Sequence, residues 1–151
     1  MTDQTDTSAD LAEIRRVVAA HVAGLHDKDV DAVMAHVGED ILCFDLAPPL
    51  ATRGAATYRR NLEAWFPTWD GPIDYEQARL EITLGGDVAF TTAFNRLGGA
   101  KEGEGTHHLW VRITAGLKKI GGQWTVVHEH VSVPFYMDGS LRACVDLTPE
   151  D

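Results

Sequence analysis

Ionisable side chains interrupt apolar patterns at three places in the chain. His21 falls among apolar residues spaced three and four apart, Asp45 ends a short apolar run, and Glu129 alternates with valines near the end of the chain. Burial changes the proton affinity of such groups, which suits them to general acid–base chemistry. The alternative is structural: a histidine bonded to a carbonyl group and an aspartate that caps the following turn.

Paired histidines also raise the question of a metal site. His107 and His108 are adjacent, and His128 and His130 share one face of a strand-like segment. A metal ion needs at least a third ligand, and no acidic residue after His130 has a suitable spacing. We therefore expect no metal. The chain also lacks a nucleophilic-serine motif, a phosphate-binding loop and a dinucleotide fingerprint, so we expect no cofactor.

The elements that must position these groups form two blocks. Apolar spacing and capping residues predict helices, and alternation predicts strands after them. The expected helices cover 11–25, 30–37 and 54–66, and the expected strands cover 41–46, 73–84, 88–97, 106–117 and 123–135. Helices followed by strands indicate an α+β domain over 11–136, with a disordered segment at 1–10 and a tail at 137–151.

Strict alternation assigns faces to the last two strands. In 106–117, Val111 and the residues at every second position from it lie on the face opposite to His108 and Trp110. In 123–135, Trp124 shares a face with His128 and His130, and the opposite face carries Val127, Glu129 and Val131.

Composition limits the partners. The chain of 151 residues has 23 acidic and 13 basic residues, a net charge of -10, which argues against nucleic acid and anionic membranes. No apolar segment is long enough to cross a bilayer, and the polar N-terminus is unlike a signal peptide. Two cysteines, Cys43 and Cys144, favour reduced thiols and a cytoplasmic location.

The order of elements and the closing segment, Gly122–Pro134, resemble the nuclear transport factor 2-like superfamily, which includes ketosteroid isomerase-like and SnoaL-like domains. The segment is also similar to the association domain of calcium/calmodulin-dependent kinase. The resemblance covers 11–135. It implies a cone-shaped, mostly antiparallel sheet around three helices, with an internal cavity. It also implies a homodimer formed through the outer sheet face, with Val127, Val131 and Val133 inside and Trp124 outside.

The resemblance further implies roles for individual residues. Asp45 would move the proton, and His21 and His108 would donate hydrogen bonds to a carbonyl group. The ligand-binding residues would be Tyr58, Trp65, Phe94, Trp110, Glu129 and Val131. In the kinase domains arginines bind a carboxylate in this cavity; the matching positions here are Phe94, His108 and Val131, so that lining is missing.

Three functions remain open on the sequence. The first is a cofactor-independent isomerase, cyclase or dehydratase that transfers a proton next to a carbonyl group of an apolar small molecule. The second is a module that binds such a molecule without changing it. The third is an assembly domain whose cavity is filled by its own side chains.

Overall fold

The computed structural model describes residues 4–151, in which three helices precede most of a six-stranded sheet. The helices are α1 (Gln4–Asp27), α2 (Val30–Met34) and α3 (Ala55–Trp65), the last followed by a 3-10 turn at Phe66–Thr68. The strands are β1 (Val37–Phe44), β2 (Thr52–Arg53), β3 (Trp69–Gly85), β4 (Val88–Lys101), β5 (Gly105–Ile120) and β6 (Gln123–Ser132). The predicted α+β class is confirmed.

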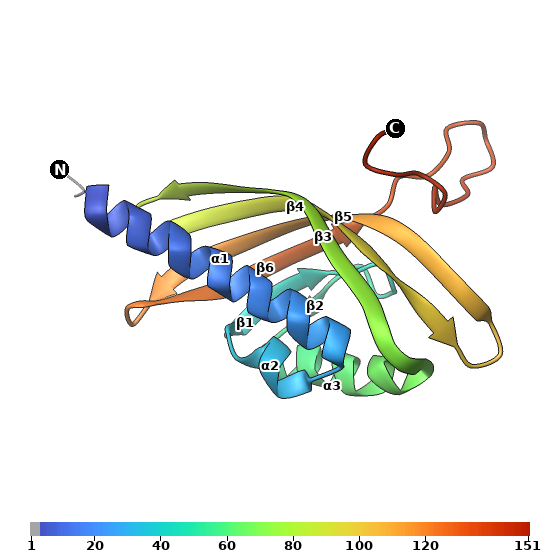
Figure 1. Ribbon diagram of the computed structural model, residues 1–151, viewed down its shortest axis with the longest axis horizontal. Helices are drawn as coiled ribbons and strands as arrows, with labels where there is room; N and C mark the ends of the chain where they lie inside the picture. The colour runs from blue at the N-terminus through green and yellow to red at the C-terminus, as the bar shows by residue number, and fades with distance from the viewer. Residues whose placement is uncertain (1–3) are drawn as a thin grey trace.

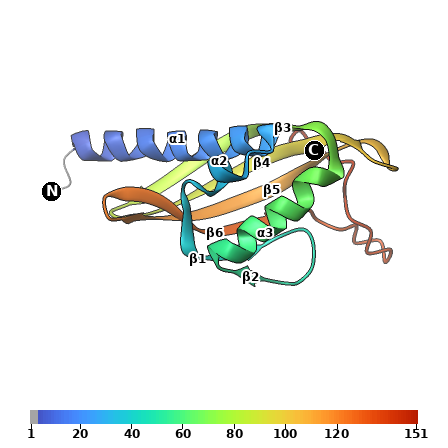
Figure 2. The ribbon, with the colours of Figure 1, turned by 90° about the horizontal axis from the view of Figure 1, so that it is seen from below.

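The sheet is curved and open, with the strand order β2-β1-β6-β5-β4-β3. All neighbouring strands are antiparallel except β1 and β6, which are parallel. In Figure 1, α1 runs diagonally across the sheet, and α2 and α3 lie below it; Figure 2 shows the molecule from that lower side. This is the arrangement expected from the resemblance, a curved sheet wrapped around helices.

The core fills the space between the helices and the concave face of the sheet. Ile14 and Val17 of α1 are buried against the sheet, where Val111 and Trp124 are each 1% exposed. Trp124 therefore lies inside the domain, and its predicted place on the outer face is wrong. The burial of its large ring contributes more apolar area than any smaller neighbour could.

Helix α1 starts earlier than the sequence indicates. It begins at Gln4, so the part of the expected disordered segment that the structure describes is helical, while residues 1–3 lie outside the described range. Asp10 attaches this part of the helix to the sheet, because its Oδ1 accepts hydrogen bonds from Trp124 Nε1 and Lys119 Nζ, both at 2.9 Å. The bond from Trp124 lowers the pKa of Asp10 most, and the bond from Lys119 lowers it further. Both bonds hold the helix on the sheet.

The chain after β6 runs beyond the end of the sheet (Figure 1). A single bridge joins Phe135 to Ala143, and Cys144 N donates to Pro134 O at 2.8 Å. Within residues 4–151 we find no helix with the length and apolar character needed to cross a membrane.

Candidate functional site

A buried carboxylate, an imidazole and a phenol meet on the concave side of the sheet. Glu129 of β6 is 8% exposed and accepts a hydrogen bond from the hydroxyl of Tyr58 on α3, 3.0 Å from its Oε2. His21 of α1 brings its Nε2 to 3.6 Å from the same oxygen. That nitrogen is buried and has no hydrogen-bond partner among the described residues. The site thus holds a fixed carboxylate beside a buried imidazole nitrogen that has no hydrogen-bond partner of its own.

A β-bulge places Glu129 inside the domain. Leu117 of β5 pairs with Val126, and Gly116, the residue before Leu117, pairs with His128. Val127 is therefore an extra residue in β6 that has no partner in β5. Trp124 and Val126 are buried before the bulge, and Glu129 is buried after it. Strict alternation would have put Trp124 and Glu129 on opposite faces, and that part of the prediction is wrong.

An amide network extends the site along β3 and β4. Asn95 of β4 is 1% exposed, and its Nδ2 donates to the hydroxyl of Tyr75 at 2.8 Å. Gln77 Nε2 in turn donates to Asn95 Oδ1 at 3.1 Å. Asn95 thereby has its buried donor and acceptor satisfied and fixes both β3 side chains.

The negative charge of Glu129 affects three neutral acids around it. Burial and then Glu129 raise the pKa of Tyr58 well above its usual value, and the same two causes, in that order, raise the pKa of Tyr75. Burial first, and Glu129 and Asp45 after it, raise the pKa of the Cys43 thiol to about 12. The site therefore opposes a second negative charge.

The structure brings His21 together with Glu129, and not with the other two predicted catalytic residues. Asp45 is exposed just beyond β1, where its Oδ1 accepts from Leu46 N at 2.6 Å. His108 is exposed on the opposite face of the sheet, with its Nε2 at 2.9 Å from Asp74 Oδ2. The pair of residues that shares the interior site is thus a histidine and a glutamate.

The predicted ligand-binding residues also separate into groups. Tyr58 and Glu129 lie in the interior site, and Val131 and Trp65 pack against the core. Phe94 lies in β4 between the buried residues Ala93 and Asn95, so its side chain is on the outer face. Trp110, which precedes the buried Val111 in β5, is on that outer face as well.

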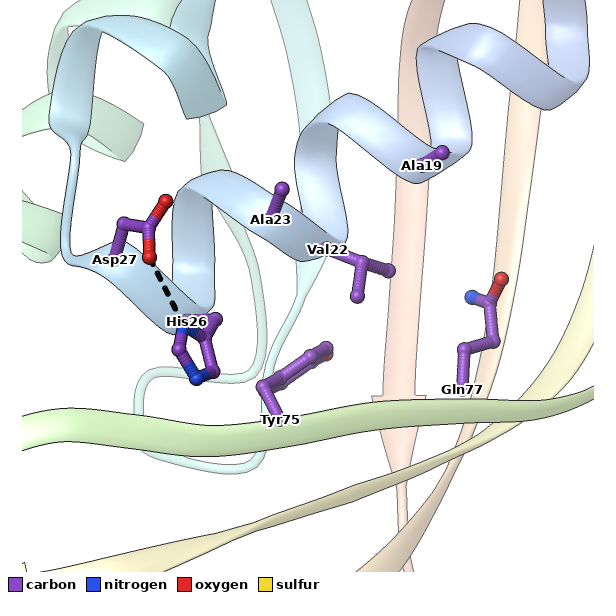
Figure 3. Close-up of a pocket in the computed structure, with 7 residues that line it drawn as sticks. All are labelled: Ala19, Val22, Ala23, His26, Asp27, Tyr75 and Gln77. Atoms are coloured by element: carbon purple, nitrogen blue, oxygen red, sulfur yellow. Dashed lines mark hydrogen bonds and ion pairs between the residues drawn. The ribbon is translucent and has the colours of Figure 1, made fainter.

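Two spaces adjoin the site. The inner cavity has a volume of about 30 Å³ and is bordered by His21, Asn95 and Glu129 among mostly apolar neighbours. A groove of about 480 Å³ lies outside it, between α1 and β3. Figure 3 shows Val22 of α1 and Gln77 of β3 pointing into the gap between these elements. The groove is within the usual size of small-molecule pockets, about 300–1,000 Å³, whereas the inner cavity is far below it.

Sequence reasoning missed Tyr75, Gln77 and Asn95. A signal for Asn95 is present, since it continues the alternating row of Ala89, Thr91, Ala93 and Leu97, all of which are buried. Tyr75 and Gln77 fall in a weaker alternation, which β-bulges in β3 interrupt. Within residues 4–151, no three His, Cys, Asp or Glu side chains gather as a metal site would require.

Comparison with known families decides the relationship. Residues 14–136 match the SnoaL-like domain. The chain belongs to the SnoaL-like family. The match covers the whole path from the core of α1 through β6, and with it every residue of the interior site. No functionally curated protein is similar enough to this SnoaL-like domain to match it.

Solved structures share the fold of this SnoaL-like domain. An NTF2-like protein of unknown function from Pseudomonas putida is 32% identical, with a TM-score of 0.85 over 94% of this chain and 98% of the other. A ketosteroid isomerase-like protein from Erwinia carotovora atroseptica is 20% identical, with a TM-score of 0.70 over 82% and 95%. A protein from Novosphingobium aromaticivorans named for scytalone dehydratase is 19% identical, with a TM-score of 0.77 over 93% and 95%.

Proposed function

We propose that this domain binds an uncharged small molecule and transfers one of its protons, as a cofactor-independent isomerase or dehydratase. The observation that carries the proposal is the buried, unpartnered Nε2 of His21 at 3.6 Å from Glu129 Oε2. A buried polar atom without a partner is costly, and such atoms concentrate where a ligand supplies the missing hydrogen bond. The names of the isomerase-like and dehydratase-like structural neighbours agree with this reaction class.

The chemistry follows from the two groups. In the proposed reaction His21 accepts a proton from a carbon next to a carbonyl group, and the carboxylate of Glu129 stabilises the imidazolium that forms. The Tyr58 hydroxyl holds that carboxylate in place. In an isomerisation His21 returns the proton to another carbon, and in a dehydration it gives the proton to the departing hydroxyl group, so the enzyme ends each cycle unchanged.

Proton exchange tests the proposal without a known product. A panel of uncharged cyclic ketones in deuterated water is followed by NMR for loss of the proton next to the carbonyl group. We expect His21→Ala and Glu129→Gln to lower the exchange rate by about 10²–10⁴-fold, the usual contribution of a general acid–base group. His36→Ala, a change at an exposed histidine outside the site, should leave it unchanged. Full exchange in both site variants would refute the mechanism.

The same assay separates this mechanism from the one predicted from the sequence. That hypothesis makes Asp45 the base, so it predicts a comparable loss in Asp45→Asn. The geometry predicts little change, because Asp45 is exposed beyond β1 and its carboxylate accepts a hydrogen bond from the backbone N–H of Leu46.

Assembly is the second candidate function, and exposed apolar side chains favour it. Val88, Phe90 and Ile120 are 49–54% exposed on β4 and β5. Phe90 alternates with the buried Ala89 and Thr91 and so lies on the outer face, where the homodimer is expected. Light scattering of the purified chain tests this: Phe90→Ser should convert a dimer to monomer, and a wild-type monomer at micromolar concentration would exclude the dimer.

The two cysteines are free, which agrees with a reducing, cytoplasmic location.

A further inference from the structure

The chain after β6 comes back to the far edge of the sheet. One transverse row of paired residues crosses the sheet from β6 to β3: Ser132, Arg112, Phe94 and Ala78. The tail starts directly after the first residue of this row. Near its end, Glu150 Oε1 lies 2.8 Å from Nη2 of Arg79, the neighbour of the last residue of the row. The two ends of the tail are therefore fixed at the two ends of one row, three strand spacings or about 14 Å apart.

Burial divides the last part of the tail into two sides. Cys144 is buried and Leu147 and Pro149 are half-buried, whereas the residues between them are exposed. A segment that is covered on one side only packs against a surface. The ion pair of Glu150 with Arg79 places that surface next to β3.

The outer face of β4 and β5 shows the matching cover. Phe90 and Phe94 lie on this same face of β4, yet Phe90 is 49% exposed and Phe94 is half-buried. Trp110, a diagonal neighbour of Phe94 on β5, is half-buried as well. Phe94 belongs to the row that the tail spans, whereas Phe90 lies about 13 Å farther along the strand. The tail is thus the segment in position to cover the two half-buried rings.

We propose that residues 144–150 act as a strap, which covers the outer face of the sheet around Phe94 and Trp110 and limits the packing of a second copy of this chain on that face. The strap itself does not depend on the proposed catalysis. Its effect on assembly rests on the proposed self-association through the outer face.

Two kinds of contact hold the strap. Leu147 and Pro149 supply apolar contact on its covered side. The ion pair between Arg79 and Glu150 sets where it ends, but these side chains are 53% and 82% exposed, so the pair alone contributes little to its stability. A strap of this kind opens without unfolding the domain, because its contacts are few and lie outside the core.

The covered face fits a second copy in charge as well as in apolar character. Arg112 and Glu81 are exposed on it, and neither takes part in an ion pair within residues 4–151. A two-fold axis through the face can bring Arg112 of one copy to Glu81 of the other. Phe90 continues the apolar surface beside the strap, so an open strap would enlarge the surface available for self-association.

The native thiol of Cys144 reports the opening of the strap in the full chain. Both cysteines are free and buried, but Cys43 belongs to the core and Cys144 to the strap. With the thiol reagent DTNB and peptide mapping, we expect Leu147→Asp to raise the labelling rate of Cys144 by about tenfold or more, because a carboxylate then enters the apolar contact. Leu50→Asp makes the same change at a leucine that is 97% exposed and should label as the wild type does. Equal rates in the two variants would overturn the strap.

Charge reversal tests the end point of the strap. Arg79→Glu and Glu150→Arg each replace an attraction by a repulsion, and each should raise the labelling rate of Cys144 by about three- to tenfold. The double variant restores an ion pair and should label nearly as slowly as the wild type. Arg60→Glu is the control, because this exposed arginine of α3 has no ion pair in the described part of the chain. Single variants that label like this control, or a double variant as fast as the singles, would refute the ion pair as the attachment.

Self-association is measured separately by light scattering over a dilution series. We expect Leu147→Asp to associate at least about tenfold more tightly than both the wild type and Leu50→Asp, a difference of about 1.4 kcal/mol. Adding Phe94→Ser to Leu147→Asp should remove this gain. Faster labelling with unchanged or weaker association would leave the strap standing and refute its effect on assembly. Tighter association without faster labelling would refute the strap as the cause.

Discussion

The bond between Tyr58 and Glu129 gives the sharpest test of the interior site. Tyr58→Phe removes only the hydroxyl that donates to Glu129 Oε2 at 3.0 Å, and both residues are 8% exposed. The carboxylate then stays buried with His21 Nε2, 3.6 Å away, as its only neighbouring side-chain partner of those described. A hydrogen bond to a charged group contributes about 1.5–3 kcal/mol, and we expect that loss in the free energy of unfolding.

Urea titration followed by tryptophan fluorescence measures this loss, and thermal unfolding provides a second reading. For a chain of this length each kcal/mol corresponds to about 2–4 °C, so the expected fall in Tm is about 3–12 °C. In a Glu129→Gln background the same Tyr58→Phe change should cost only about 0.5–1.5 kcal/mol, because the amide oxygen is a neutral acceptor. The difference between the two costs measures the contribution of the charge.

Tyr136→Phe is the matched control. Its hydroxyl also donates to a carboxylate, that of Asp146, but both groups lie in the exposed part of the tail. We expect no measurable change in the unfolding midpoint for this variant. Equal effects of Tyr58→Phe and Tyr136→Phe, or a neutral Tyr58→Phe, would refute the view that Glu129 is a buried, charged and hydrogen-bonded group.

Three further predictions concern pH and packing. Folding raises the pKa of Tyr75, so Tyr75 loses its proton at lower pH in the unfolded chain, and the free energy of unfolding falls as pH rises above about 10. In urea titrations at several pH values, Tyr75→Phe should reduce this fall by about 1.4 kcal/mol per pH unit. Asp10→Asn should destabilise the chain at neutral pH. The difference from wild type should start to shrink as pH falls below 3.8, the ordinary pKa, and should vanish once pH is below the lowered pKa of Asp10. Gly98→Ala should cost about 1–3 kcal/mol, because the new Cβ would lie 2.3 Å from the His108 ring, whereas Gly85→Ala, with open space around it, should cost less; equal losses would contradict this.

Local patterns predicted most of the secondary structure. The apolar spacing of α1 and α3 and the glycine turn after β3 depend on neighbouring residues, and those elements appear where expected. The attachment of α1 to the sheet at Asp10 could not be predicted in the same way. Asp10 bonds to Trp124 and Lys119, which are more than a hundred positions away in the chain.

The site was predicted less well, for two different reasons. Glu129 was identified as a lone carboxylate among valines, but its position relative to Trp124 depends on a bulge that strict alternation does not reveal. For His108 the strand pattern was sufficient, since it places this residue opposite the buried row of Val111. The match to the family pattern placed His108 in the cavity, and the local pattern was the better guide.

The extra residue in β6 links the shape of the domain to its chemistry. Val127 marks the position where pairing with β5 shifts by one residue, and pairing with β1 is also irregular there. Bulges increase the bend and twist of a strand. Removing Val127 would straighten this part of the open, curved sheet yet keep Glu129 in phase with Trp124. Adding one further residue between the bulge and Glu129 would turn the glutamate outward and the neighbouring histidines inward. Within the SnoaL-like family, single-residue insertions at this position would therefore provide a short evolutionary route to a different set of proton donors in the same fold.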